Sequence, residues 1–418
     1  MNAPVHFDPA MDALSVPLDR IDVSDPTLYQ QDIYHPYFAR LRREDPVHYR
    51  KDGMYGSFWS VTRFKDIMQV ETSQAVYSSE ARLGGITITD RPMEFRRSSF
   101  ISMDPPRHDE QRKVVSPIVA PANLNNMSGI IRERVCKVLD NLPRNETFDW
   151  VQRVSIELTT LMLATLFDFP VEERRKLTFW SDCATADVNA GGIVDSEEKR
   201  LEILTEALRT FTALWHERAA RPPGYDLISM LAHGEATKNL VNDPAEFLGN
   251  LTLLIVGGND TTRNSMSGGL LALCKHPAEY RKLRDNPALI PSMVPEIIRW
   301  QSPIVHMRRT ALADAELGGK QIRKGDKVVM WYVSGNRDEE SIERPDDFII
   351  DRARPRHHLS FGFGIHRCVG NRLAELQLTI LWEEVMKRFP VIELVEEPKR
   401  IYSNFIHGIT EMKVRIPA

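Results

Sequence analysis

The sequence predicts a mainly α-helical protein with a minor β region. Apolar residues recur at helical spacing over most of 130–234, and a second, longer helix pattern runs from 243 to about 274. Runs of β-forming residues fall at about 45–62, 315–333 and 391–417. Residues 1 to about 33 are polar and irregular, so we expect an arm on the surface. The length of 418 residues by itself fits two to three domains.

Composition narrows the class of protein. Hydrophobic content of 42%, charged content of 27% and a net charge of −4 are typical of a soluble protein and argue against nucleic acid as a partner. The four cysteines are widely spaced and form no C-x-x-C, which favours a reducing cytosol over a disulfide framework or zinc site. The N-terminus lacks the pattern of a signal peptide, and no apolar run approaches the roughly 18 residues that span a bilayer. We therefore expect a cytoplasmic protein with no membrane anchor.

The first half of the chain contains two strands, a loop and several helices. Residues 47–49 and 58–62 are predicted strands around a turn, and the Gly-, Thr- and Arg-rich stretch 81–99 is either a plain surface loop or a lid over a pocket. Asp104-Pro105-Pro106 then opens a helix that carries His108 and Arg112 on one face. The later stripe of Leu201, Leu204, Leu208, Phe211 and Trp215 is interpreted as core.

The helix predicted over 243–274 contains an unusual centre. Asp243 is a good N-cap and Pro244 suits the first helical position. In its middle lies Gly-Gly-Asn-Asp-Thr-Thr, from Gly257 to Thr262, and each glycine costs about 1 kcal/mol against alanine in a helix. Either this segment is a kink without chemistry, or it has a function that requires these residues.

A single cysteine, Cys368, stands at the end of a glycine-punctuated turn, just before an amphipathic helix. A thiol there faces the positive end of the helix dipole and free N–H groups, so we expect a lowered pKa and a thiolate ligand. The alternative is a small buried hydrophobe, the usual role of a lone cysteine.

The string F-G-x-G-x-H-x-C-x-G, from Phe361 to Gly370, resembles the haem-binding loop of the cytochrome P450 superfamily. The resemblance implies one mainly α, triangular haem-thiolate domain over residues 1–418, and haem b (iron protoporphyrin IX) as cofactor. Cys368 becomes the axial iron ligand, since a thiolate favours O–O cleavage. The other cofactor-binding residues of this loop are Phe361, Gly362, His366 and Gly370.

Further motifs are similar to those of the same family. His108 and Arg112 are implied to hold one haem propionate and Arg309 the other, with Arg308 as an alternative to Arg309. Gly257 and Gly258 leave space for the cofactor and dioxygen. Thr261 is implied to hold a water or the bound oxygen, and Asp260 to relay protons from solvent. This acid–alcohol pair points to the use of dioxygen.

Glu296 and Arg299 resemble the family's E-x-x-R motif, a buried network that supports the cysteine loop. An isolated pair of this spacing is commonplace on exposed helices, where it contributes about 0.3–0.5 kcal/mol. The usual third arginine is missing from Pro345-Asp346-Asp347-Phe348, and Arg344 or Arg352 replaces it.

The resemblance implies monooxygenation of an apolar small molecule with dioxygen, with electrons from NAD(P)H through a ferredoxin reductase and a ferredoxin. Arg367, Arg372 and Lys113 offer either a basic docking face or an ordinary solvated surface. Two segments look most like bacterial alkane hydroxylases that attack terminal methyl groups, so we expect ω-hydroxylation of medium-chain alkanes or fatty acids; the alternative substrate is a terpene or another hydrophobic molecule. The predicted substrate contacts are nearly all apolar: Leu254, Ile255, Ile304, Val305, Phe405 and Ile406.

Two other classes of function stay open. A haem-binding sensor or carrier uses Cys368 but needs no proton relay, so the variant Thr261→Ala separates it from an enzyme. In a protein that binds no haem, Cys368 is only a residue of the hydrophobic core. The absorption spectrum of the reduced protein with carbon monoxide distinguishes that case.

Overall fold

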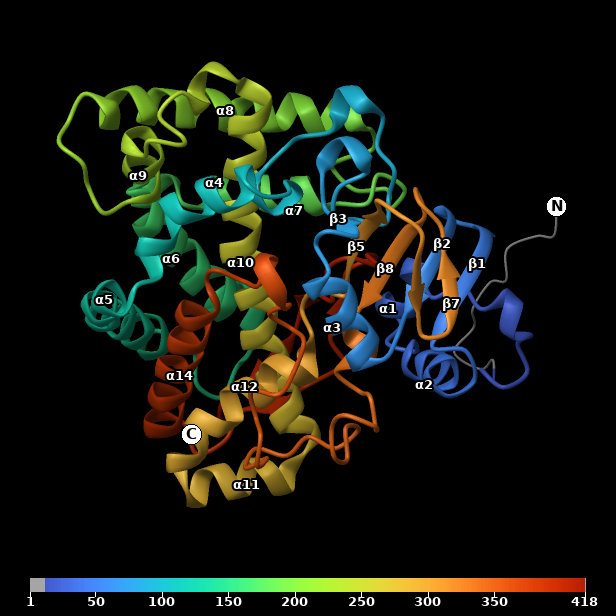
Figure 1. The fold of residues 1–418 in the computed structure, drawn as a ribbon. Helices are drawn as coiled ribbons and strands as arrows, with labels where there is room; N and C mark the ends of the chain where they lie inside the picture. Colours follow the sequence, from blue (N-terminus) through green and yellow to red (C-terminus); the bar gives the residue numbers. More distant parts are fainter. Residues whose placement is uncertain (1–11, 418) are drawn as a thin grey trace.

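The computed structural model describes residues 12–417; residues 1–11 and 418 lie outside the described part. Helices form most of it, and a small sheet packs at one side (Figure 1). The predicted mainly α fold class with a minor β region is therefore confirmed.

Most of the helices bury apolar residues on the side that faces the interior. The helices are α1 (Pro26–Gln30), α2 (His35–Glu44), α3 (Phe64–Thr72), α4 (Arg107–Val115), α5 (Pro121–Asp140), α6 (Ile156–Phe167), α7 (Arg175–Thr185), α8 (Glu197–Ala219), α9 (Leu227–His233), α10 (Pro244–Lys275), α11 (Pro277–Asp285), α12 (Ile290–Gln301), α13 (Tyr332–Gly335) and α14 (Asn371–Arg388).

The strands come from distant parts of the chain. They are β1 (Val47–Gly53), β2 (Gly56–Val61), β3 (Tyr77–Ser78), β4 (Thr147–Asp149), β5 (His306–Ala311), β6 (Ala315–Leu317), β7 (Lys320–Ile322), β8 (Lys327–Trp331), β9 (Glu393–Leu394), β10 (Lys399–Arg400), β11 (Ile409–Glu411) and β12 (Lys413–Arg415).

The five-stranded sheet has the order β1-β2-β8-β5-β3, in which only the β2–β8 pair is parallel. Smaller sheets pair β4, β12 and β9, β6 with β7, and β10 with β11. Strand β5 was not predicted, because its Arg308-Arg309 pair resembles a ligand motif more than a strand. It pairs with β8 and β3, and this burial on both sides explains why its two arginines are buried.

Helix α10 runs through the middle of the helical part of the molecule, and the five-stranded sheet lies to one side of it (Figure 1). The Asp243 carboxylate accepts a hydrogen bond of 3.0 Å from the Glu246 N–H, which confirms the predicted N-cap. The Gly257–Thr262 region remains helical throughout. The largest apolar core cluster joins α10 to helices α5, α6, α8, α12 and α14.

The predicted surface arm is wrong for its described part. Ile21, Val23, Leu28 and Tyr29 are at most 1% exposed and pack with Trp331 of β8 in a second core cluster. The scattered apolar residues of this stretch match neither the helix nor the strand period, so periodicity missed them. Residues 1–11 of the predicted arm lie outside the described residues. Between residues 12 and 417, no helix is both long and apolar enough to cross a membrane.

Candidate functional site

A cavity of about 510 Å³ lies beside the middle of α10. Its wall includes the loop over 81–99, the start of α8, the segment over 303–309 and the loop that precedes α14. The stretch 81–99 is therefore a wall of the cavity rather than a plain surface loop.

The loop before α14 presents Cys368 to this cavity. Gly362 and Gly364 both have φ of 64°, a left-handed conformation that favours glycine. A Cβ at Gly364 would lie 2.2 Å from the Glu71 carbonyl oxygen of α3. The Cys368 N–H donates to the Phe361 carbonyl at 2.8 Å, which closes the turn and brings both residues to the wall.

The electrostatics of Cys368 differ from the prediction. The thiol is reached from the cavity but lies deep in the protein, and this burial raises its pKa. The Gly370 N–H, Arg112 and Arg367 lower it, but burial outweighs them. The predicted lowering of the pKa considered the helix dipole and free N–H groups but not the loss of solvation on burial. The free protein therefore favours the thiol, and a bound metal must displace its proton.

Basic groups meet at the same wall. Arg112 donates to the Arg367 carbonyl and has no carboxylate within ion-pair distance among the described residues. Arg309 forms an ion pair of 3.3 Å with Glu71. By contrast, Arg308 pairs with Asp90 outside the cavity, so Arg309 is the better placed of the two alternatives.

Two histidines complete this group. The rings of His108 and His366 are 4.4 Å apart, and the structure gives no hydrogen-bond partner to His108 Nε2 or His366 Nδ1, both buried. Burial, Arg309 and His108 lower the pKa of His366 to about 2, so it is neutral. A thiol facing a cavity, with the Arg112 guanidinium and two buried imidazole nitrogens beside it, suits a flat metal cofactor that carries carboxylates.

Helix α10 forms the opposite wall. Gly257 is exposed to the cavity, and a Cβ placed there would meet no atom within 4 Å. Gly258 also lines the cavity, but its Cβ would lie 2.7 Å from Leu163 Cδ2 of α6, so packing between helices also requires this glycine. The Thr261 hydroxyl donates to the Gly257 carbonyl at 2.8 Å and also lies on the wall.

Asp260 points away from the cavity wall and is fully buried. Its carboxylate accepts hydrogen bonds from Arg263 at 2.8 Å and from the Thr185 hydroxyl at 3.3 Å. Arg263 also reaches Asp182 at 3.0 Å, whose side chain is 51% exposed. Burial raises the pKa of Asp260, although Arg263 opposes this. Thr185 lines the cavity, and sequence analysis missed it because α7 carries no motif.

The predicted substrate contacts divide into two groups. Leu254, Ile304 and Phe405 line the cavity, whereas Ile255, Val305 and Ile406 do not and are at most 2% exposed. Ile255 lies on another face of α10 and packs in the core. Residues 304 and 406 form a β-bridge, and the Val305 N–H donates to the Phe405 carbonyl at 2.9 Å, which joins the two segments beside the cavity. The prediction that Ile255, Val305 and Ile406 contact the substrate is therefore wrong, because they do not line the cavity.

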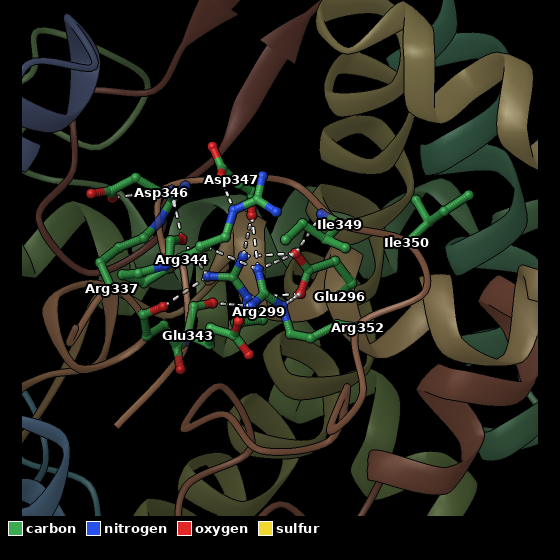
Figure 2. Close-up of polar contacts among 12 residues, drawn as sticks. Glu296, Arg299, Arg337, Glu343, Arg344, Asp346, Asp347, Ile349, Ile350 and Arg352 are labelled. Atoms are coloured by element: carbon green, nitrogen blue, oxygen red, sulfur yellow. Dashed lines mark hydrogen bonds and ion pairs between the residues drawn. The ribbon is translucent and has the colours of Figure 1, made fainter. Parts of the chain in front are cut away.

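Glu296 and Arg299 form a fully buried ion pair at 2.7 Å (Figure 2). Arg352 donates to the Glu296 carboxylate at 2.9 Å, whereas Arg344 pairs with Asp347 at the surface. Arg299 also donates to the carbonyls of Asn336, Pro345 and Asp347. Arg352 thus takes the place of the absent third arginine, and the network ties α12 to the chain that leads toward the Cys368 loop.

Comparisons with known proteins decide the family. The model of the cytochrome P450 family matches residues 197–415. Linalool 8-monooxygenase of Pseudomonas putida is 37% identical over 95% of this chain and 99% of that protein. The chain belongs to the cytochrome P450 family.

Solved structures of the family superpose closely on this P450. Cytochrome P450-153 from Novosphingobium aromaticivorans is 46% identical, covers 94% of this chain and 99% of its own, and has a TM-score of 0.89. CYP153D17 from Sphingomonas sp. PAMC 26605 is 48% identical, covers 96% of this chain and 100% of its own, and has a TM-score of 0.90. The resemblance drawn from the Cys368 loop is confirmed, and the protein is a P450 monooxygenase.

The family implies a haem-thiolate cofactor. The residues around the cavity fit it: Cys368 would supply the thiolate, and Arg112, Arg309, His108 and His366 would supply groups for the propionates. These individual roles remain predictions.

Proposed function

We propose that this P450 hydroxylates the terminal carbon of medium-chain alkanes or fatty acids. The observation that carries the proposal is the apolar wall that Leu254, Ile304 and Phe405 form in the cavity that also contains Cys368. The α10 and Cys368-loop segments, which resemble those of bacterial alkane hydroxylases, support it. Terminal C–H bonds are the strongest in such substrates, so the wall must hold the chain end-on.

Haem b, when bound, supplies the activation of dioxygen that C–H hydroxylation requires. In our proposal Cys368 binds its iron, while Arg112, Arg309, His108 and His366 hold its propionates. Gly257 leaves room for the cofactor and oxygen beside α10. The Thr261 hydroxyl, which lies on the wall above this space, orients a water or bound oxygen.

Protons reach the cavity, in this proposal, along a path through α7 and α10. Arg263 stays protonated and holds the Asp260 carboxylate near the exposed Asp182, and the Asp260 carboxylate contacts the Thr185 hydroxyl on the cavity wall. Burial raises the pKa of Asp260, so its carboxyl group takes up a proton more readily than an exposed aspartate and can take part in the relay. Thr185 then passes the proton to water beside Thr261.

Electrons are proposed to come from NAD(P)H through a ferredoxin reductase and a ferredoxin. Arg367, Arg372 and Lys113 are exposed, and none has a carboxylate within 4.0 Å among residues 12–417. Such unpaired cations near the Cys368 loop suit an acidic protein partner.

A terpenoid is the second candidate substrate. The relative from Pseudomonas putida is named for linalool, and a similar P450 from Mycobacterium marinum, 31% identical with a TM-score of 0.87, was solved with pseudoionone. Both are hydrophobic molecules that an apolar wall accepts equally well.

Product analysis tests whether the substrate is an alkane or fatty acid or instead a terpenoid. We expect the reconstituted enzyme to convert octane to 1-octanol and decanoate to its ω-hydroxy acid, with linalool turned over more slowly. Only subterminal alcohols, or no turnover of octane and decanoate alongside fast turnover of linalool, would refute the proposal.

A further inference from the structure

Charged residues gather on the part of the cavity wall formed by the loop over 81–99 and the start of α8. Four arginines line it together with two carboxylates, which leaves positive charge in excess; they are Arg91, Arg96, Arg97, Arg200, Glu197 and Asp187. Positive charge inside an apolar cavity is costly unless an anion neutralises it.

The contacts leave this charge unbalanced. Arg200 donates to Glu197 at 2.5 Å, and Arg91 lies 3.5 Å from the same carboxylate, so two guanidinium groups share one anion. Among residues 12–417, Arg97 donates only to backbone carbonyls, those of Glu94 at 2.6 Å and Arg96 at 3.0 Å. Asp187 contacts the Tyr55 hydroxyl and Asn189 rather than an arginine.

The three guanidinium groups of Arg91, Arg97 and Arg200, named here the arginine cluster, act on one another. Burial lowers the pKa of Arg91, and repulsion from Arg200 and Arg97 lowers it further, while Glu197 opposes both effects. Arg91 Nε is buried without a hydrogen-bond partner. An added anion would therefore relieve repulsion within this cluster.

The Arg97 end of the cluster lies far along α10 from Thr261, whereas Arg200 donates to the Cys183 and Ala186 carbonyls near the end of α7. A Cβ at Gly249 would lie 2.0 Å from the Ser98 carbonyl and 3.3 Å from Arg97 Cβ, so Arg97 packs beside Gly249. Thr261 follows twelve residues later, a separation of roughly 18 Å at 1.5 Å per residue. Leu253 and Val256, both on the cavity wall, lie between Gly249 and Thr261. The cavity thus has a cationic part, an apolar stretch and the Cys368 site.

We propose that the arginine cluster is a carboxylate subsite, which holds the head group of a fatty acid while its methyl end reaches the Thr261 side. This inference rests on the proposed terminal hydroxylation and narrows it to carboxylate-ended chains. Glu197 occupies the cluster when no substrate is present and competes with the ligand.

Calorimetric titration of the holoenzyme with dodecanoate and with methyl dodecanoate tests the subsite. Arg97→Gln should raise the dissociation constant of dodecanoate about tenfold, because one charge-assisted hydrogen bond is lost. The dissociation constant of methyl dodecanoate should change by less than about twofold. Glu197→Gln removes the competing anion and should tighten dodecanoate binding. Arg209→Gln, an exposed arginine of α8 outside the cavity, is the matched control and should change neither constant.

The outcomes separate this inference from the proposed function. An unchanged ratio of acid to ester affinity in both Arg97→Gln and Glu197→Gln overturns the subsite, even if octane is still hydroxylated at its end. A ratio that falls in Arg97→Gln and rises in Glu197→Gln supports the subsite, even if the products are subterminal alcohols and terminal hydroxylation fails.

Discussion

Cys368 illustrates how a single residue depends on its surroundings. Glycines at 362 and 364 turn the loop, and the Phe361 carbonyl accepts a hydrogen bond from the Cys368 N–H, so Cys368 lies on the cavity wall. Burial keeps it protonated in the free protein. A haem iron bound here would take the place of the thiol proton, and Cys368 would then act as a thiolate ligand.

Replacing this sulfur tests the axial ligand. In Cys368→Ser we expect the reduced protein with carbon monoxide to lose the absorption band of a thiolate-bound haem, and hydroxylation to fall below detection. An unaltered spectrum together with full turnover in this variant would contradict the assignment.

The Thr261 hydroxyl lies on the cavity wall, next to Gly257. Thr261→Ala should let the enzyme consume NAD(P)H while product formed per electron pair falls at least about tenfold, because a positioned proton donor contributes about 10²-fold or more. Thr205→Ala is a matched control, since its hydroxyl makes the same local bond, to Leu201 at 2.7 Å, away from the cavity. If Thr261→Ala has no effect on any activity, a sensor or carrier is favoured.

At the scale of elements, buried ion pairs fix the loops around α12. Glu296 lies between Arg299 and Arg352, and Arg299 binds three carbonyls of the chain over 336–347. Burial alone would raise the pKa of Glu296, but the hydrogen bonds from Arg299 and Arg352 lower it below its ordinary value. The carboxylate is thus charged in the folded protein and contributes to stability.

Variants of Arg352 and Arg344 compare the contribution of a buried ion pair to stability with that of an exposed one. Arg352→Gln should lower the free energy of unfolding by about 2 kcal/mol, since it removes bonds to a buried carboxylate. Arg344→Gln, whose ion pair with Asp347 is exposed, should change it by less than about 0.5 kcal/mol. Urea unfolding measures both, and equal losses would contradict the assignment of Arg352.

The same network predicts a dependence on pH. Because the folded-state pKa of Glu296 lies below its unfolded value, its contribution is fully present above the unfolded pKa and is lost as pH falls through the folded pKa. Glu296→Gln should therefore be less stable at neutral pH and lose less stability on acidification. Unfolding curves at several acidic pH values measure this difference.

At the scale of the molecule, the Cys368 loop joins the cavity to an exposed cationic surface. Arg372→Glu should slow reduction by an acidic ferredoxin, and added salt should narrow the difference from the unmodified protein, because steering by charge is screened. Arg323→Glu, on the distant β6–β7 hairpin, is the control for net charge. Stopped-flow reduction rates that do not change in Arg372→Glu would remove this residue from the docking surface.

The motifs predicted from sequence were local ones. The N-cap at Asp243, the helical glycine segment and the string around Cys368 are each specified within a few residues, so they identified the helix, the family and the mainly α fold. That residues 1–418 form one domain, and the roles assigned to single site residues, stay predictions.

Tertiary structure decided what distant segments do together. Only packing shows that Ile304 and Phe405 face the cavity while Val305 and Ile406 face the core, that Arg352 rather than Arg344 reaches Glu296, and that Asp260 meets Thr185. Contacts between distant segments also bury Cys368 and bring Arg91, Arg97 and Arg200 close together. Motifs depend on near neighbours in the chain, whereas burial and charge balance depend on neighbours in space, which exist only once the chain has folded.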